Sequence, residues 1–523
     1  MRLRVLAFAS LSFALSALAG GAAAGADDAA ALLARHHAYV GWGAGDGVLQ
    51  SARITFASAP AAPRPGASPD PLGDPDRRSV EVRRELLYRS RSMAYGRDTG
   101  QEGFTGNVVW RSNENGYTVT VRGRDARDEL TADVIEAEAA DRVPAVSRPG
   151  MTLEGKPAAV VRISPAAGAP ADLYLDRDTG AMLGYALEPD DPRERSVVRV
   201  TAYAEFAPGK RYVSEFRVDG SRPVRVTRFE PNVPVSDADL HPPAPTPAWT
   251  FGAPRAVPIT IALASYGGGR SVRIEARING KLGRFLFDSG DGGIDLSAAF
   301  ARAAGVKEVG RSAYSGVNGR TIPATAALVE TLTIGGSTLR NVLVQTSQSG
   351  EPTGDDGTIG FDVLAGAIVN VDLDAKTFSV LDPAATDVRV APGAYAFPID
   401  LSEFHAGVPL KVAGNVLSHV WLDTGDDFFV VLPHELERHI TAVTDGSIYF
   451  GGVDGVGDEP ARCVRLNEIQ VGPYRYQQAA SCFATNDVFD AEGGLIGFDF
   501  LRHFNWTFDY PHGTVVLTPN NAR

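Results

Sequence analysis

The second half of the chain carries the same ordered set of short motifs twice, and this duplication restricts the possible fold more than any other feature. Each copy starts with an apolar run that leads into Asp-Ser/Thr-Gly, "FLFDSGD" in the first and "VWLDTGD" in the second. The two aspartates, Asp288 and Asp423, are 135 positions apart, and a tyrosine follows each of them after 26 residues, Tyr314 and Tyr449. Motifs kept in order at this spacing indicate two duplicated lobes rather than a short solenoid repeat.

Later motifs keep the same order in both copies. The first copy has "TIGFDVL" and the second has "LIGFDFL", which place Gly360 and Gly497 at 72 and 74 residues after their aspartates. We therefore expect one lobe over residues 257–388 and a second over 389–523. The matched spacing predicts that they form one two-fold-symmetric β unit, with the two aspartates facing each other across a cleft.

Residues 27–243 are expected to form an antiparallel β-rich domain. Short, partly alternating runs such as "GYTVTVRGR" and "RYVSEFRVDG" are separated by Gly, Asp and Pro, which is typical of strands and turns. A helix is expected around "AAALLARHHAYVGW". The prolines of "HPPAPTPAWTFGAP" break both helix and ladder, so residues 244–256 are predicted to be a linker. The predicted fold class is mainly β.

Two further Asp-Thr-Gly sequences serve as internal controls. Asp98 and Asp178 each follow an arginine and lie where one strand-like run ends and another begins. Asp and Gly in such places favour turn geometry. Neither aspartate is expected to be catalytic.

Residues 1–26 have the pattern of a secretory signal peptide. A basic start precedes an apolar stretch and small residues that end at Ala26, the order of segments that directs export. The alternative, an uncleaved membrane anchor, is disfavoured because the apolar stretch is short for a bilayer. We expect an exported protein, periplasmic or secreted, without a membrane span in the mature chain. The net charge of -13 disfavours a nucleic-acid partner.

The two cysteines, Cys463 and Cys482, flank two strand-like runs that meet at Gly472-Pro473. In a hairpin with that turn, residues whose numbers add to 945 face each other, as 463 and 482 do. Cross-strand neighbours are close enough for a disulfide, and an export route permits one. A Cys463–Cys482 disulfide is therefore predicted, with two free buried thiols as the alternative.

The duplicated half resembles the retropepsin-like aspartic peptidases. In that family an apolar strand leads into D-[ST]-G, a glycine-containing flap hairpin follows, and an apolar pair ending in glycine packs behind the active loop. The resemblance covers about half of the chain, which looks like a tandem fusion of two short lobes. It implies that Asp288 and Asp423 share a proton and activate a water molecule that attacks a peptide bond.

The resemblance also implies roles for the residues around the dyad. The hydroxyl groups of Ser289 and Thr424 would cross-link the two active loops, and Gly290 and Gly425 would leave room for the substrate backbone. The glycines packed behind the loops and the flap residues complete the predicted site: Gly360, Gly497, Tyr314, Gly316, Tyr449 and Gly451. Ordinary hairpin packing is the alternative role for the two tyrosines.

The chain departs from the family at one position in each lobe. The residue after D-[ST]-G is usually Ala or Ser, but it is Asp291 in the first lobe and Asp426 in the second. An acid so near the dyad should raise its apparent pKa values or compete for its protons. Because both lobes carry the same change, we interpret it as tuning of the site.

Two functions are compatible with these patterns. The first is an exported aspartic endopeptidase that acts as a monomer on a peptide or protein in extended conformation, without metal or cofactor. The second is a non-catalytic envelope carrier in which the lobes only clasp a peptide and the first domain holds an apolar ligand. The end of that domain, "YLDRDTGAMLGYALE" to "VTRFEPNVPVSDADLHPP", is similar to the curved sheets of LolA-like lipoprotein carriers. The chain contains no H-E-x-x-H, G-x-S-x-G, C-x-x-C or phosphate-binding loop.

Overall fold

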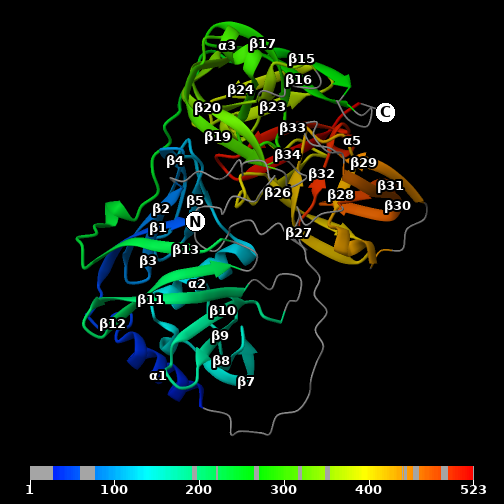
Figure 1. The fold of residues 1–523 in the computed structure, drawn as a ribbon. Helices are drawn as coiled ribbons and strands as arrows, with labels where there is room; N and C mark the ends of the chain where they lie inside the picture. The colour runs from blue at the N-terminus through cyan, green and yellow to red at the C-terminus, as the bar shows by residue number, and fades with distance from the viewer. Residues whose placement is uncertain are drawn as a thin grey trace, which may run out of the picture. The chain divides into compact units, whose positions relative to one another are not determined.

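The computed structural model describes residues 28–58, 77–190, 197–218, 222–263, 270–315, 321–347, 354–438, 440, 445–450, 459–484 and 493–521. The chain divides into two units (Figure 1). Unit 1 comprises Met1–Asn113 and Thr120–Pro243, and unit 2 comprises Glu114–Val119 and Ala244–Arg523. Strands predominate in both units, which confirms the prediction of a mainly β fold.

Unit 1 is built on an antiparallel sheet whose strands follow the order β5-β4-β3-β2-β1-β13-β12-β11-β10-β9-β8-β7. Its strands are β1 Ser51–Ser58, β2 Arg78–Arg84, β3 Leu87–Ala94, β4 Arg97–Phe104, β5 Val109–Ser112, β7 Ala145–Leu153, β8 Lys156–Ile163, β9 Ala171–Asp176, β10 Met182–Leu187, β11 Val197–Ala207, β12 Lys210–Val218 and β13 Val224–Pro231. Its helical elements are α1 Ala29–Val40, α2 Gly123–Glu136, η1 Ala140–Arg142 and η2 Asp237–Asp239.

Helix α1 lies where the sequence predicts a helix. Asp28 caps its start, because the carboxylate accepts a hydrogen bond from the amide of Ala30, and Gly41 ends it in the left-handed region at φ +78. Leu32 and Leu33 of α1 belong to the same buried cluster as Val161 and Leu173 of the sheet. This apolar contact holds the helix against strands β8 and β9.

Unit 2 contains two lobes with matching elements. The first has β15 Val257–Leu263, β16 Arg270–Ile278, β17 Lys281–Phe287, β18 Ile294–Ser297, α3 Ala298–Ala303, β19 Lys307–Ser315, β20 Thr321–Ile334, β21 Ser337–Ser347, β22 Gly357–Ile359, α4 Phe361–Leu364, β23 Ile368–Asp372 and β24 Thr377–Leu381. The second has β25 Tyr395–Pro398, β26 Gly407–Val412, β27 Asn415–Leu422, β28 Val430–Leu432, η3 His434–Arg438, β29 Asp445–Phe450, β30 Glu459–Val471, β31 Tyr474–Phe483, β32 Leu495–Ile496, α5 Phe498–Leu501, β33 Phe504–Asp509 and β34 Thr514–Pro519. Two short strands, β6 Thr118–Thr120 and β14 Ala248–Thr250, precede the lobes in the chain.

Six strands shared by the lobes form a sheet with a palindromic order, β15-β24-β23-β33-β34-β25. At its centre β23 pairs with β33 in antiparallel fashion, with Ile368 opposite Asp509 and Val371 opposite Trp506. Outward from this pair, each lobe's last strand pairs with its own first strand. The order therefore reads the same from either edge, as a two-fold axis between β23 and β33 requires.

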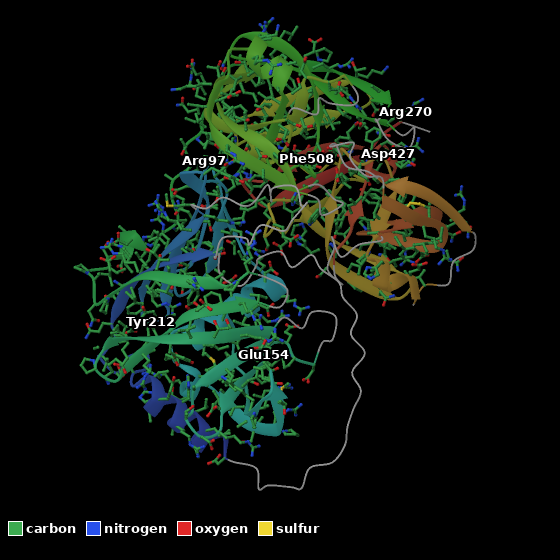
Figure 2. The ribbon with its side chains drawn as sticks, in the orientation of Figure 1. Arg97, Glu154, Tyr212, Arg270, Asp427 and Phe508 are labelled. Atoms are coloured by element: carbon green, nitrogen blue, oxygen red, sulfur yellow. A yellow bond between two sulfur atoms is a disulfide. The ribbon has the colours of Figure 1, made fainter. Side chains whose placement is uncertain are left out.

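Aromatic side chains pack the interior next to this sheet. Phe508 (Figure 2) lies edge-on to Phe287 at 5.8 Å and to Trp506 at 6.1 Å between ring centroids. Phe287 comes from the first lobe and Phe508 from the second, and both are fully buried. Apolar burial of this kind is the main stabilising contribution, so the two lobes share one core.

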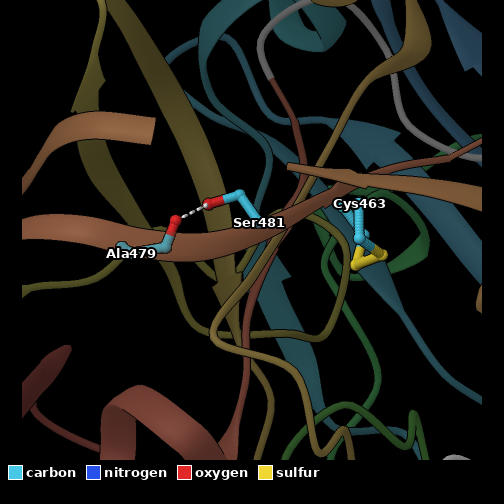
Figure 3. The surroundings of a disulfide bond; sticks show 4 residues. Cys463, Ala479 and Ser481 are labelled. Atoms are coloured by element: carbon cyan, nitrogen blue, oxygen red, sulfur yellow. Dashed lines mark hydrogen bonds between the residues drawn. A yellow bond between two sulfur atoms is a disulfide. The ribbon is translucent and has the colours of Figure 1, made fainter. Parts of the chain in front are cut away.

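The predicted disulfide joins Cys463 on β30 to Cys482 on β31 (Figure 3). The two cysteines are direct cross-strand partners in a hairpin whose turn contains Gly472, as the sequence arithmetic requires. In the first lobe, the same hairpin position is occupied by Ala326 opposite Gln345. The prediction of this disulfide is confirmed.

Among the described helices, none is both long and apolar enough to cross a membrane.

Candidate active site

Each Asp-Ser/Thr-Gly sequence forms a loop directly after a buried strand. The loop of the first lobe follows β17, which runs parallel to β22, and that of the second follows β27, which runs parallel to β32. The amide of Asp288 donates to the carbonyl of Ile359 at 3.0 Å, and that of Asp423 donates to Ile496 at 2.9 Å. Two equivalent strand pairs thus hold the two aspartates at equivalent positions.

Gly360 and Gly497 follow these partner strands and lie against the backs of the active loops. A Cβ atom on Gly360 would be 2.4 Å from the carbonyl oxygen of Asp291, and one on Gly497 would be 2.3 Å from that of Phe428. Real side chains do not tolerate such distances, so each position needs glycine for this close approach.

Four hydrogen bonds join the two loops through their hydroxyl groups. The Oγ atom of Ser289 donates to the carbonyl of Leu422 at 2.6 Å, and the amide of Thr424 donates to that Oγ at 3.1 Å. In return, Oγ1 of Thr424 donates to the carbonyl of Phe287 at 2.9 Å and accepts from the amide of Ser289 at 3.0 Å. Both side chains are fully buried. A fully satisfied buried network of this kind holds the loops in one register.

The carboxyl groups of Asp288 and Asp423 each lie against the glycine of the opposite loop. A Cβ atom on Gly290 would be 2.3 Å from Oδ2 of Asp423, and one on Gly425 would be 2.3 Å from Oδ2 of Asp288. From the sequence, we expected these glycines to leave room for the substrate backbone. In the structure, the space that a side chain would take is occupied by the other lobe's carboxyl group.

Burial raises the pKa of both aspartates of the dyad. Burial is the main cause of the raised pKa of Asp288, followed by the negative charges of Asp423 and Asp291. Burial also raises the pKa of Asp423. A hydrogen bond with the Asp288 carboxyl group opposes this shift, as do the backbone amides of Asp426 and Gly425, which both donate to Oδ1 of Asp423. Two adjacent carboxyl groups in such surroundings retain one proton between them at pH values where exposed acids have lost theirs.

The extra acids after the two glycines are half-buried. Burial raises the pKa of Asp291 to about 6, although the amide of Gly293 donates to its Oδ1 at 2.9 Å and opposes the shift. Burial also raises the pKa of Asp426 well above its usual range, helped by the charges of Asp423 and Asp427. These two acids therefore carry less negative charge near neutrality than surface aspartates do.

The flap residues can be followed only along the backbone. Tyr314 lies on β19 opposite Ile322, and Tyr449 lies on β29 opposite Pro460. Gly316 and Gly451 lie outside the described residues. Contact of either flap with a substrate therefore stays a prediction.

Of the two control sequences, Asp178-Thr179-Gly180 forms a turn as expected, whereas Asp98-Thr99-Gly100 lies within strand β4, directly after the β3–β4 turn. Asp98 lies in the β3–β4 hairpin and pairs with Arg91 at 2.6 Å, on an exposed part of unit 1. Asp178 lies between β9 and β10, where its amide donates to Asp176 at 3.1 Å.

Two contacts near the active loops involve residues that belong to none of the sequence motifs. The imidazole of His405 lies 3.0 Å from the carbonyl oxygen of Gly290. The side-chain amide of Asn115, on the short segment Glu114–Val119, donates to Oδ2 of the buried Asp362 at 3.0 Å. A lone histidine and a lone asparagine form no pattern, so only the folded chain reveals these contacts.

Within the described ranges, no group of three or more His, Cys, Asp or Glu side chains is arranged to hold a metal ion.

Comparison with known families identifies one region. Residues 274–363 match the family model described as aspartyl protease. The match extends from β16 through the first active loop to α4. No curated protein matches the chain. The first lobe is thus an aspartyl-protease-like region.

Proposed function

We propose that unit 2 is an aspartic endopeptidase that uses Asp288 and Asp423 as its catalytic dyad. The observation that carries this proposal is the reciprocal approach of each carboxyl group to the glycine of the opposite loop. The cross-linked hydroxyl groups and the raised pKa of both aspartates support it further. The family match to the first lobe agrees with it.

The dyad would act as general base and general acid together. In the starting state the pair holds one proton. The ionised carboxylate takes a proton from a water molecule while the water oxygen attacks the peptide carbonyl, and the protonated carboxyl donates its proton to the carbonyl oxygen. Proton transfer to the amide nitrogen then breaks the C–N bond, and the dyad returns to its singly protonated state. No covalent enzyme intermediate forms.

The substrate would be a peptide or protein segment in extended conformation, because strands that pair with flap hairpins are extended. Both aspartates come from one chain, so a monomer would suffice for activity. The proposed location is outside the cytoplasm, in the periplasm or secreted, on the strength of the leader-like first residues.

A peptide-library cleavage assay over pH 3 to 8 tests this function. We expect cleavage that a statine-type inhibitor blocks, because such an inhibitor imitates the tetrahedral adduct between the carboxyl groups. Cleavage that persists in the presence of the inhibitor would indicate a contaminating peptidase of another class. Inhibitor binding without any cleavage would indicate that unit 2 only clasps a peptide.

A cavity in unit 1 supports a second candidate function, the holding of an apolar ligand. The cavity encloses about 940 Å³, its open mouth included, and its wall is mainly apolar. Trp42, Ile54, Met182 and Phe216 are among its lining residues. Sites that hold small molecules are typically concave and lined mainly by apolar side chains, as this one is.

The charged groups in the cavity wall have ion-pair partners. Arg83 binds Glu81 and Asp133, each at 2.9 Å. An apolar ligand therefore fits the remaining wall better than a charged one.

Binding of a fluorescent long-chain fatty acid to the full chain would test this second function. Val200 lines the cavity. The larger side chain of Val200→Trp would fill part of the cavity and should weaken binding about tenfold or more. The control Val146→Trp, at an exposed position, should leave binding unchanged. Equal affinities for the two variants would contradict the ligand-holding function.

A further inference from the structure

His405 contacts the first active loop and the strand that leads into the second. Its Nε2 atom is 3.0 Å from the carbonyl oxygen of Gly290, two residues after Asp288. Its ring stacks on the indole of Trp421, two residues before Asp423, with centroids 4.2 Å apart and planes 17° apart. One side chain thus bridges the loop of one lobe and the strand that leads into the loop of the other.

The hydrogen bond to Gly290 defines the protonation of the ring. A carbonyl oxygen only accepts, so Nε2 must carry a hydrogen and donate it. Burial lowers the pKa of His405 to about 4, against the opposing effect of the backbone carbonyls of Glu403 and Gly290. At neutral pH the ring is therefore uncharged and carries its hydrogen on the nitrogen that faces Gly290.

The loop that presents His405 is closed and strained. The amides and carbonyls of Asp400 and Gly407 exchange two hydrogen bonds at 3.0 and 2.8 Å, and the amide of Leu422 donates to Ala406 at 2.9 Å. Phe404, directly before the histidine, has φ +64, in the left-handed region that bulky residues avoid. Such a conformation persists only where the surroundings hold it, and it is concentrated at functional sites.

Phe404 is held by a contact with the other lobe. Its ring packs edge-on against Phe361 of α4, with centroids 5.2 Å apart. Phe361 is itself fixed behind the first active loop, because its amide donates to the carbonyl of Asp291 at 2.9 Å. The strained loop of the second lobe is thus anchored to the back of the first lobe's active loop, next to the residue that His405 binds.

The position of Gly290 matters to both carboxyl groups of the dyad. Its amide donates to Oδ1 of Asp288 at 2.8 Å, and its Cα faces the carboxyl group of Asp423 so closely that a Cβ atom would not fit. A shift of Gly290 therefore moves one carboxyl group and changes the space for the other. Displacements of about 1 Å in such sites cost up to about 100-fold in rate.

We propose that His405 is a positioning residue that holds Gly290, and with it the spacing of Asp288 and Asp423, through its Nε2 hydrogen bond. This inference rests on the proposed peptidase function. Among the described residues, only the second lobe supplies such a positioning residue. In the first lobe Arg273 pairs with Leu286 as Gly407 pairs with Trp421, so Ser271 takes the place of His405 and Leu286 that of Trp421. The near-symmetric dyad thus has an asymmetric support.

Three full-length variants separate the hydrogen bond from the ring packing. His405→Phe keeps a ring to stack on Trp421 and loses the donor, whereas His405→Gln loses the ring and keeps an amide donor. His503→Phe is the matched control, since His503 also lies beside an aromatic ring, that of Tyr476 at 5.8 Å, but far along the chain from either loop. Rates are expressed per active site, titrated with a statine-type inhibitor, so that any unfolded fraction does not count.

We expect His405→Phe to lower kcat about tenfold while KM changes less than about threefold. His405→Gln should recover kcat to within about threefold of the wild type, and His503→Phe should match the wild type. A merely structural role would instead reduce the number of titrated sites and leave kcat per site unchanged.

Two results would overturn the role of His405 alone: an active wild type with an equally active His405→Phe variant, or a His405→Gln variant no better than His405→Phe. A wild-type chain without any inhibitor-sensitive cleavage would overturn the proposed function, and the role of His405 with it.

Discussion

At the scale of single residues, the close approach of two carboxyl groups is the feature from which the chemistry follows. Each is nearly removed from water, at 8% exposure, and each lies against the other lobe's glycine. Ionising both would place two negative charges together in a poorly solvated space, so the pair retains a proton. That retained proton is the acid that peptide hydrolysis requires.

Replacing either catalytic aspartate by asparagine tests this pair. Asp288→Asn or Asp423→Asn should abolish hydrolysis, because an amide cannot take a proton from water or share one with its partner. The double variant should be little worse than either single variant, since the two groups act as a unit. Peptide affinity and thermal stability should change little, because the amide has nearly the shape of the carboxyl group. Asp98→Asn and Asp178→Asn, in the two control sequences, should keep full activity.

The extra acids should affect the alkaline side of the activity profile. The negative charge on Asp291 helps Asp288 to keep its proton as the pH rises. Burial raises the pKa of Asp291 to about 6, so that its charge is present mainly above that pH. Replacing both acids by asparagine removes the charge of Asp291, and the dyad then loses its proton at lower pH. We expect the alkaline limb of kcat/KM to move to lower pH, with a smaller change in the acid limb. A shift to higher pH would contradict this account.

At the scale of elements, the β30–β31 hairpin of the second lobe carries a disulfide that the matching hairpin of the first lobe lacks. Cys463 and Cys482 join β30 to β31, and Cys482 lies on the strand next to β28, which follows the active loop. The equivalent pair in the first lobe, Ala326 and Gln345, has the same register without the bond. The disulfide is therefore an addition to a hairpin that the backbone forms in either case.

Losing the disulfide should destabilise the chain without changing the fold of the hairpin. Cys463→Ser with Cys482→Ser should lower the free energy of unfolding by about 2–4 kcal/mol, because the unfolded chain gains conformational freedom. Gln345→Ser, at the matched position of the first lobe, is the control and should change stability by less than about 1 kcal/mol. Chemical denaturation of both variants measures the difference. Equal midpoints for the double variant and the wild type would contradict it.

The elements differ in how far they could be predicted from the sequence. Repeated spacing predicts the hairpin of Cys463 and the apolar strands before both aspartates, because local periodicity and turn residues determine them. Contacts between distant segments have no such signature. The stretch around Asn115 has the pattern of an ordinary turn and strand, and nothing along the chain marks its buried contact with Asp362. Likewise, the space beside Gly290 is filled by the opposite lobe's carboxyl group, a packing detail that only the assembled lobes define.

At the scale of the whole molecule, the chain crosses between its two units more than once. Residues Glu114–Val119 interrupt unit 1 and belong to unit 2. There Asn115 is 1% exposed, and its amide side chain also donates to the carbonyl of Leu343 at 2.9 Å. Tyr117 packs edge-on against Phe361 with centroids 6.4 Å apart. The first half of the chain therefore contributes a buried part of the proposed peptidase.

This crossing predicts that the halves stay together after the chain is cut. A specific cleavage site inserted between Pro243 and Ala244 would yield two fragments, the first of which still contains Glu114–Val119. Because that segment is buried in unit 2 through Asn115 and Tyr117, we expect the cut fragments to co-elute in native size-exclusion chromatography and to separate only in denaturant.

Asn115→Ala with Tyr117→Ala removes the buried hydrogen bonds and the ring contact, so these changes should release the fragments from each other or weaken their association about tenfold or more. Asn107→Ala, at an exposed position of unit 1, is the control and should leave the fragments associated. Free separation of the unmutated fragments in native buffer would show that the segment does not hold the halves together, and would allow the first half to be a removable pro-region.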